Sequence, residues 1–599
     1  MKRVLVGVLS LVLASIAFAG PAPQATKSSA KTKAPKAPSV ASQLKTMSDA
    51  LAVQQKQIED LRQQLTSRDQ AVQALQQRLD QSQAAAAQAQ AQAQAATAEA
   101  TKQEQSVTAL RSDVDDIKQN ASTTALTIQE TQKNIKDAIE SPIAIHYKGI
   151  TLTPGGFLAA ETVWRSHALG SDVNTPFNSI PFSGASQANL SEFFGSGRQS
   201  RISLLAQGKL SSATIGGYYE ADFLSAGVTS NNNESNSYTL RQRQAWAQAA
   251  LNSGWTFTGG QMWSLVTETK NGVDNRTEAL PMTIDPQYTV GFSWARQYGF
   301  RVSKKLGNNF WAAFSVEDPQ TTFTAHGANN NFLIGEAGTG GGLYNLNANY
   351  SFNSSPDLVF KVVGQGGPAH VEIFGLLAQF RDRVFPCATT TGPCDGTTGP
   401  SAAGAFNDSR TGGGFGVNAR VSLIHKQLDL GFHGLGGPGI GRYGTAGLSD
   451  ATVRPDGTLA LIHGYQGLGT VEAHGKKFDV YLNYGAEYAA RTWYTNTLVT
   501  PSSTTGYGSP SFKNTGCGSE TVPGAGGFAP GALVSCTGDT RQIAEATVGF
   551  WFKPYNGPKG RIQFGPQYSY IERNAWSGVG GAPKATENMF LTSFRYYLP

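Results

Sequence analysis

Charged residues are scarce in this chain: Asp, Glu, Lys and Arg make up 15% of its 599 residues. Soluble proteins are typically about a quarter charged. Met is also rare, with 5 residues, whereas Gly is abundant at 68 residues and aromatic residues reach 10%. A transmembrane β-barrel has this profile because lipid-facing and lumen-facing residues alternate along each strand and cancel in the average. The composition therefore favours a barrel over a set of soluble domains.

Long apolar runs are missing after the first twenty residues. Residues 1–19 have a basic start at Lys2 and Arg3, an apolar run from Val4 to Phe18 and a small-residue cleavage motif, which together predict a secretory signal peptide. Further along there is no run of about 18 apolar residues, which a helix needs to cross a bilayer. An exported chain of this kind is either soluble in the periplasm or a barrel in the outer membrane.

Cysteine is limited to four residues, which fall in two close pairs within Gly-, Thr- and Ser-rich sequence: Cys387 with Cys394, and Cys517 with Cys536. In an oxidising compartment this spacing predicts two loop disulfides. Metal binding by these cysteines is disfavoured because no His neighbours them. The 8 His are scattered, without a His-x-x-x-His or His-x-His pair, so neither a metal nor a cofactor is expected.

Motifs for catalysis are also missing. The chain has no Gly-x-Ser-x-Gly elbow before a helix, and an enzyme is not expected. A Ser and His site assembled across neighbouring strands, as in an outer-membrane esterase or phospholipase, is the minor alternative. The formal net charge of +6 is mild, and no nucleic-acid partner is expected.

The N-terminal quarter contains two segments that are not barrel-like. Residues 20–43 are rich in Ala, Pro and Lys and predict a flexible basic linker, with contact to anionic cell-wall polymer as a less favoured alternative. Residues 44–140 predict a periplasmic coiled coil, since apolar residues recur every seven positions and so specify a left-handed supercoil. The repeat includes Leu44, Leu51, Ile58, Leu65, Val72, Leu79, Val107, Val114, Ile128 and Ile135.

An isolated helix cannot bury this row of apolar residues, so we expect the chain to oligomerise through the coiled coil. The mixture of Leu, Ile and Val does not fix the number of helices. A homotrimer is preferred because outer-membrane channels are commonly trimeric. Pro142 then ends the helix because proline lacks a backbone donor.

From residue 142 to 599 the apolar period changes from seven to two. Segments of about ten residues recur between Gly, Asn, Pro or Ser positions, as a tilted strand crossing the hydrocarbon layer requires. Short gaps such as Gly307-Asn308-Asn309 alternate with long ones such as residues 495–540. Unpaired backbone groups are costly in lipid, so the strands must close on themselves. We expect an all-β antiparallel barrel of about sixteen strands, with eighteen as the alternative, and residues 340–352 and 458–474 as ambiguous regions.

Arginines lie inside several expected strands, notably Arg201, Arg241, Arg243 and Arg301. A charged side chain on the lipid face near the midplane costs about 2 to 4 kcal/mol, so these arginines are expected to face the lumen. An electropositive lumen concentrates anions. The alternative is that the acidic strand residues Glu161, Glu220 and Asp222 neutralise the arginines in ion pairs that only stiffen the barrel.

The stretch from about residue 150 to 305 contains a series of short motifs. In order, they are Glu192-Phe-Phe-Gly, Arg198-Gln-Ser-Arg-Ile-Ser-Leu, Gly217-Tyr-Tyr-Glu-Ala-Asp-Phe, Leu240-Arg-Gln-Arg-Gln-Ala-Trp, Gly259-Gly-Gln-Met-Trp-Ser and Arg296-Gln. In their order and spacing these motifs resemble the DcaP-like outer-membrane channels. The resemblance implies a signal peptide, an N-terminal helical extension and trimeric barrels that pass small anionic solutes.

The sequence thus predicts a passive porin of the Gram-negative outer membrane, surrounded by its lipid, with the coiled coil in the periplasm. Arg201, Arg241, Arg243, Arg296 and Arg301 are expected to line or guard the constriction. Arg296 is the exception in the pattern, since alternation with Tyr298 would point it outward unless it lies at a turn. The alternative function is structural: the barrel anchors a periplasmic rod that tethers or spaces the outer membrane and the cell wall, with peptidoglycan as its partner.

Overall fold

The computed structural model describes residues 145–224, 239–327, 332–333, 352–387, 399–424, 426–497, 501–522 and 533–599. The predicted signal peptide, linker and coiled coil lie outside these residues, as do Cys394 and most of the ambiguous region 340–352. Among the described residues, no helix is long and apolar enough to cross a membrane.

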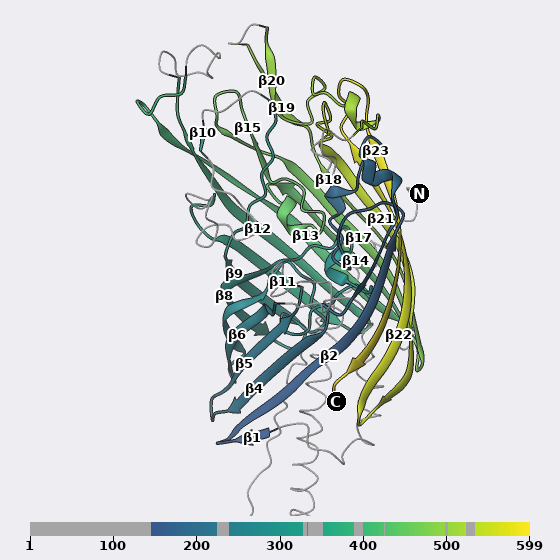
Figure 1. Ribbon diagram of the computed structural model, residues 1–599. Helices are drawn as coiled ribbons and strands as arrows, with labels where there is room; N and C mark the ends of the chain where they lie inside the picture. The colour runs from purple at the N-terminus through teal and green to yellow at the C-terminus, as the bar shows by residue number, and fades with distance from the viewer. Residues whose placement is uncertain are drawn as a thin grey trace, which may run out of the picture. The chain divides into compact units, whose positions relative to one another are not determined.

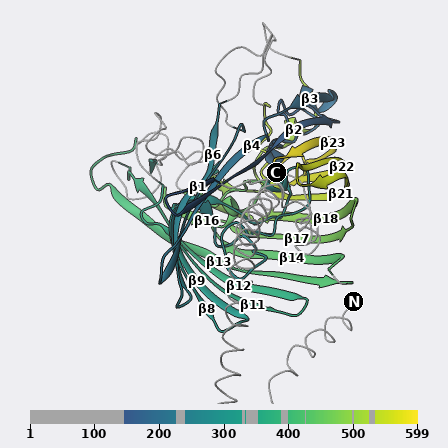
Figure 2. The same cartoon turned by 90° about the horizontal axis from the view of Figure 1, so that it is seen from below.

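Sixteen antiparallel strands form one closed ring in the described part of the chain (Figures 1 and 2). The first strand, β2, pairs with the last, β23, on one side and with β4 on the other, which seals the cylinder. The expected count of sixteen is therefore confirmed. The strands in ring order are β2 (Ile150–Arg165), β4 (Arg201–Lys209), β5 (Ala213–Asp222), β6 (Arg241–Leu251), β7 (Trp255–Trp263), β8 (Arg296–Leu306), β9 (Phe310–Glu317), β11 (Asp357–Gly366), β12 (Ala369–Val384), β13 (Phe406–Leu423), β14 (Leu428–Pro438), β17 (His463–His474), β18 (Phe478–Ala489), β21 (Thr540–Gly557), β22 (Gly560–Ala575) and β23 (Lys584–Tyr597).

The period-two pattern gives the barrel an apolar exterior and a polar interior. In β23, Phe590 and Phe594 are exposed on the outside, whereas Ser593 and Arg595 are buried on the inside. The same alternation holds in β12, where Ile373 is exposed and Glu372 is buried. Apolar side chains therefore cover the outside of the barrel, an arrangement that is typical of transmembrane β-barrels.

Short turns join the strands at one end of the barrel and long loops join them at the other (Figure 1). The turn at Gly307 is typical of the short end: Gly307 adopts a φ of 71°, which glycine tolerates. The ambiguous region 458–474 contains a loop strand, β16 (Leu459–Leu461), followed by the wall strand β17.

The remaining regular elements precede β2 or lie in the loops. They are β1 (Ile145–Tyr147), β3 (Glu192–Ser196), β10 (Phe332–Leu333), β15 (Ala451–Val453), β19 (Thr492–Asn496), β20 (Ser503–Tyr507) and the 3-10 turns Phe177–Ser179, Ser186–Asn189, Pro286–Tyr288, Gly441–Tyr443 and Thr515–Cys517. A disulfide joins Cys517 and Cys536 in the loop between β18 and β21, and Cys387 is also disulfide-bonded.

Candidate pore constriction

The loop between β7 and β8, residues 264–295, is folded into the barrel, and we refer to it as the inner loop. Most of its residues are buried. Its backbone N–H groups donate to side chains that face inward from strands around the ring. These bonds are Leu265 to Glu317 (2.8 Å), Thr269 to Glu372 (2.9 Å), Ile284 to Gln567 (2.7 Å), Val290 to Glu545 (2.8 Å) and Gly291 to Glu487 (3.0 Å). The inner loop therefore crosses the lumen and is attached to well-separated parts of the wall.

The attachment at Gly291 leaves no room for a side chain. Its φ is +83°, and a Cβ there would lie 2.0 Å from the carbonyl oxygen of Gly467 in β17. The sequence folds this way locally because glycine allows both the left-handed backbone and the close approach to the wall.

Arg241 and Arg243 lie beside the inner loop and are paired with acidic residues of β5. Arg241 donates twice to Asp222 (2.9 and 2.8 Å), and Arg243 contacts both Asp222 (2.7 Å) and Glu220. A register irregularity between Glu220 and Ala221, where β5 pairs with β6, brings both arginines to Asp222 and lets Arg243 reach Glu220 as well. Arg201 of β4 adds a further ion pair with Glu220 at 3.6 Å. These arginines are thus largely neutralised, as the alternative interpretation of the sequence requires.

The side chains of these arginines differ in how far they are exposed. The side chain of Arg241 is 30% exposed, whereas those of Arg201 and Arg243 are fully enclosed. Arg301, also buried, donates to Asn275 of the inner loop (2.7 Å) and to the carbonyl of Trp263. Of these four, only Arg241 presents much surface to a solute.

Arg296 begins β8 and is held against the inner loop. Its guanidinium lies over the rings of Trp263 (5.0 Å) and Trp294 (5.6 Å) and donates through Nη2 to Gln287. Within the described residues, its Nε and Nη1 have no hydrogen-bond partner, and no carboxylate forms an ion pair with it. Alternation fails to predict the position of Arg296 because the inner loop enters β8 there.

A second group of charged and polar residues joins the inner loop to β2 and β23, the first and last strands, whose pairing closes the barrel. Arg595 of β23 donates to Glu161 of β2, to Gln199 (2.7 Å) and to the carbonyl of Ile284 (2.8 Å). Gln199 in turn donates to Asp285 of the inner loop at 3.0 Å. The sequence pattern places Glu161 on a strand but does not connect it with the inner loop, because Gln199 and Asp285 lie in loops without periodicity.

Burial raises the pKa values of two side chains in the inner loop. It raises the pKa of Asp285 well above its usual range, and the nearby Glu161 carboxylate raises that pKa further. Burial also raises the pKa of Tyr288. A neutral Asp285 would leave the neighbouring arginines with fewer counter-charges.

No protein-family model and no characterised protein sequence matches the chain. Among solved structures, it is similar to the outer membrane channel DcaP of Acinetobacter baumannii, with 15% identity over 76% of this chain and 99% of that chain and a TM-score of 0.49. It is also similar to the anion-selective porin from Comamonas acidovorans, with 10% identity over 75% and 100% of the two chains and a TM-score of 0.37.

The closed ring itself is defined by the pairings of this chain. Around the inner loop the ring gathers Arg201, Arg241, Arg243, Arg296 and Arg301, although they come from β4, β6 and β8. What the described residues bring together here is a group of charged side chains, most of them in ion pairs, beside a loop that is folded into the barrel.

Proposed function

We propose that the protein is a porin of the outer membrane, through which small solutes diffuse past the inner loop. The closed ring satisfies the backbone hydrogen bonds of its strands, which is the condition for placing β-structure in lipid. The apolar exterior suits lipid, and the polar interior suits water. The inner loop narrows this interior and so would set the size limit of the channel.

We further propose a preference for anions. Four of the constriction arginines, Arg201, Arg241, Arg243 and Arg296, lie with Arg595 among four carboxylates, Glu161, Glu220, Asp222 and Asp285. Arg301 is left out of this group because it donates to Asn275 and to the carbonyl of Trp263. Within the group the positive charges exceed the negative by one, and by two when Asp285 is protonated. The single observation that carries this proposal is Arg296, which has no ion-pair partner among the described residues and keeps two buried guanidinium nitrogens without hydrogen bonds. Because these nitrogens are enclosed, the charge of Arg296 acts on anionic solutes through its electric field and not by direct contact.

Planar-bilayer recording of the purified full-length protein tests both proposals. We expect stable conductance and, in a salt gradient, a reversal potential on the anion side. Arg296→Gln should lower the anion preference, whereas Arg383→Gln, whose side chain bonds to Asn407 in an exposed position at the loop end of β12, should not. A folded protein without conductance would overturn the porin proposal. Unchanged selectivity in Arg296→Gln would overturn the role of Arg296.

We also propose that three chains associate in the membrane. Small residues gather on the outer face of β4 to β7, where large apolar side chains would otherwise face lipid: Ala206, Gly208, Gly217, Ala247, Ala249 and Gly259 line a shallow groove of about 530 Å³. Small residues allow close approach of neighbouring backbones in a membrane. Conductance steps in groups of three, and a cross-linked trimer in membranes, are the expected observations.

A further inference from the structure

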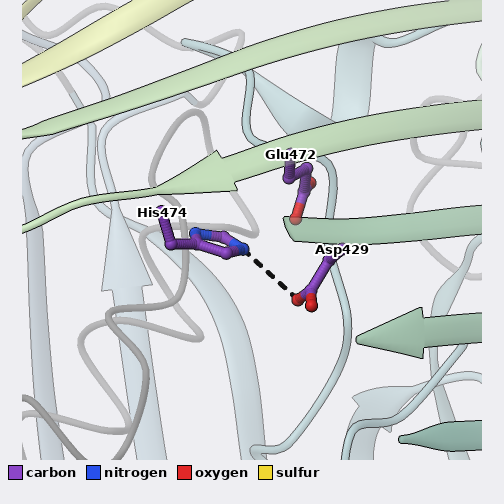
Figure 3. Close-up of side chains that lie close together, drawn as sticks. All are labelled: Asp429, Glu472 and His474. Carbon is purple, nitrogen blue, oxygen red and sulfur yellow. Dashed lines mark hydrogen bonds and ion pairs between the residues drawn. The ribbon is translucent and has the colours of Figure 1, made fainter. Parts of the chain in front are cut away.

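Three potential metal ligands meet on the inner wall near the short-turn end of the barrel: Asp429 of β14, and Glu472 and His474 of β17 (Figure 3). Asp429 and Glu472 are directly paired across the two strands, and His474 lies two residues beyond Glu472 on the same face. One ligand atom from each side chain lies within 4.8 Å of the other two. This triad is separate from the arginines at the constriction.

The geometry of the triad is close to that of a coordination shell. His474 Nε2 lies 3.3 Å from Asp429 Oδ2. For zinc bound tetrahedrally at about 2.0 to 2.2 Å from nitrogen and oxygen ligands, two ligands are separated by roughly 3.3 Å. In Figure 3 the Glu472 carboxylate also points toward the space beside this pair. Only a small movement of Glu472 is needed to bring all three atoms to a common centre.

Two negative charges lie opposite each other within the triad. Asp429 and Glu472 occupy directly paired positions, where like charges repel and a bound cation is favoured. Arg420 supplies one positive charge, which is shared between Glu472 (3.3 Å) and Glu268 of the inner loop (2.9 Å).

The triad is largely buried, which raises the free-energy cost of its carboxylate charges and restricts access to it. Glu472 is fully buried and the side chain of His474 is 3% exposed, whereas Asp429 is 15% exposed. Asp429 is thus the side from which an ion could enter from the lumen. An imidazole with two carboxylates favours first-row transition metals over Mg²⁺ or Ca²⁺, which prefer oxygen ligands alone.

We propose that Asp429, Glu472 and His474 bind one divalent transition-metal ion, of which Zn²⁺ is the test case, with lumen water completing its coordination. The ion offsets the repulsion between Asp429 and Glu472 and links β14 to β17. Bound there, it adds positive charge to the inner wall at these two strands.

Zinc binding by the full-length protein in detergent, produced without a histidine tag and treated with a chelator beforehand, tests this proposal. We expect one Zn²⁺ per chain in equilibrium dialysis at neutral pH. Asp429→Asn and His474→Gln should each weaken binding by about tenfold or more, since each removes a ligand. His463→Gln is the matched control, because His463 lies on the same strand but is exposed on the opposite face. The proposal is overturned if the wild type binds no zinc saturably, or if His474→Gln binds it as tightly as the wild type.

A second measurement needs no variant and covers the case in which a substitution disturbs assembly. Anomalous scattering at the zinc edge, from wild-type crystals grown with zinc, should give a peak about 2.0 to 2.2 Å from the three ligand atoms. A peak only elsewhere, or none, contradicts the proposal. Neither experiment depends on conductance, so the porin proposal stands or falls separately.

Discussion

Arg595 in the last strand donates to the carboxylate of Glu161 in the first strand, with Nε 3.0 Å from Oε1, although 434 residues separate them in sequence. Both side chains are fully enclosed. The pair lies across the seam where β23 meets β2. The two ends of the barrel domain are therefore joined by an ion pair in addition to the backbone ladder.

Arg595→Met should weaken the seam strongly, because it leaves Glu161 buried without its cation. Breaking one partner of a buried ion pair typically costs about 3 to 5 kcal/mol. The expected result is a lower temperature at which the folded barrel unfolds on heat-modifiability gels. Glu161→Gln combined with Arg595→Met should recover part of the loss, since no charge is then left buried. Equal unfolding temperatures for the wild type and Arg595→Met would show that the pair does not stabilise the seam.

Neutralising Arg241 and Arg243 together should strongly reduce anion preference. Asp222 and Glu220 would lose their ion pairs with these two arginines, so the constriction would lose two positive charges while keeping its carboxylates. We expect the ratio of anion to cation permeability to fall by about threefold or more. Lys304→Gln with Lys305→Gln removes the same charge from the short-turn end of β8 and is the control. A similar change in both double variants would mean that total charge, and not the position of these arginines, sets selectivity.

Anion preference should also decrease as the pH rises through the elevated pKa of Asp285. Below that pKa the carboxyl group is neutral and the positive excess is larger; above it, the inner loop gains a negative charge. Asp285→Asn should remove this pH dependence and keep the low-pH selectivity throughout. Reversal potentials measured from pH 5 to 9 for both proteins provide the test. A wild-type profile that does not differ from that of Asp285→Asn would show that Asp285 does not change its charge in this range.

The sequence predicted the barrel well because the period-two pattern is a local property of each strand. The short gap expected at Gly307-Asn308-Asn309 is the turn that joins β8 to β9. In β17 the pattern was ambiguous because Gly464, Gly467 and Gly469 interrupt the alternation of side chains. The inner loop could not be predicted, since folding a loop into the lumen leaves no period in its residues.

The constriction and the metal triad depend on register, which a single sequence does not reveal. Arg243 contacts two carboxylates because of the irregularity between Glu220 and Ala221, and no local pattern marks that position. Only two of the three proposed metal ligands, Glu472 and His474, are close in sequence. Asp429 joins them through pairing with Glu472, 43 residues later.

The contact between His326 and Asp539 should make loop stability depend on pH. His326 Nε2 lies 2.8 Å from Asp539 Oδ1, and this hydrogen bond raises the pKa of His326. A raised pKa in the folded state stabilises the contact fully below the unfolded value of about 6.5, and the stabilisation is lost as the pH rises through the folded value. The difference in unfolding temperature between the wild type and His326→Gln should therefore be larger at pH 5.5 than at pH 9. A difference that is constant with pH would contradict this.

Substituting Gly291 should alter the channel without opening the barrel. In Gly291→Ala the new Cβ would lie 2.0 Å from the Gly467 carbonyl, so the inner loop must move away from the wall and into the lumen. Gly447→Ala is a matched control: Gly447 also has a positive φ, +60°, but nothing lies within 4 Å of its added Cβ. Both variants carry backbone strain of about 1 to 3 kcal/mol, so only the steric contact with the wall distinguishes them. We therefore expect lower single-channel conductance and a noisier open state in Gly291→Ala alone. Equal conductance in the two variants would mean that the inner loop does not set the width of the pore.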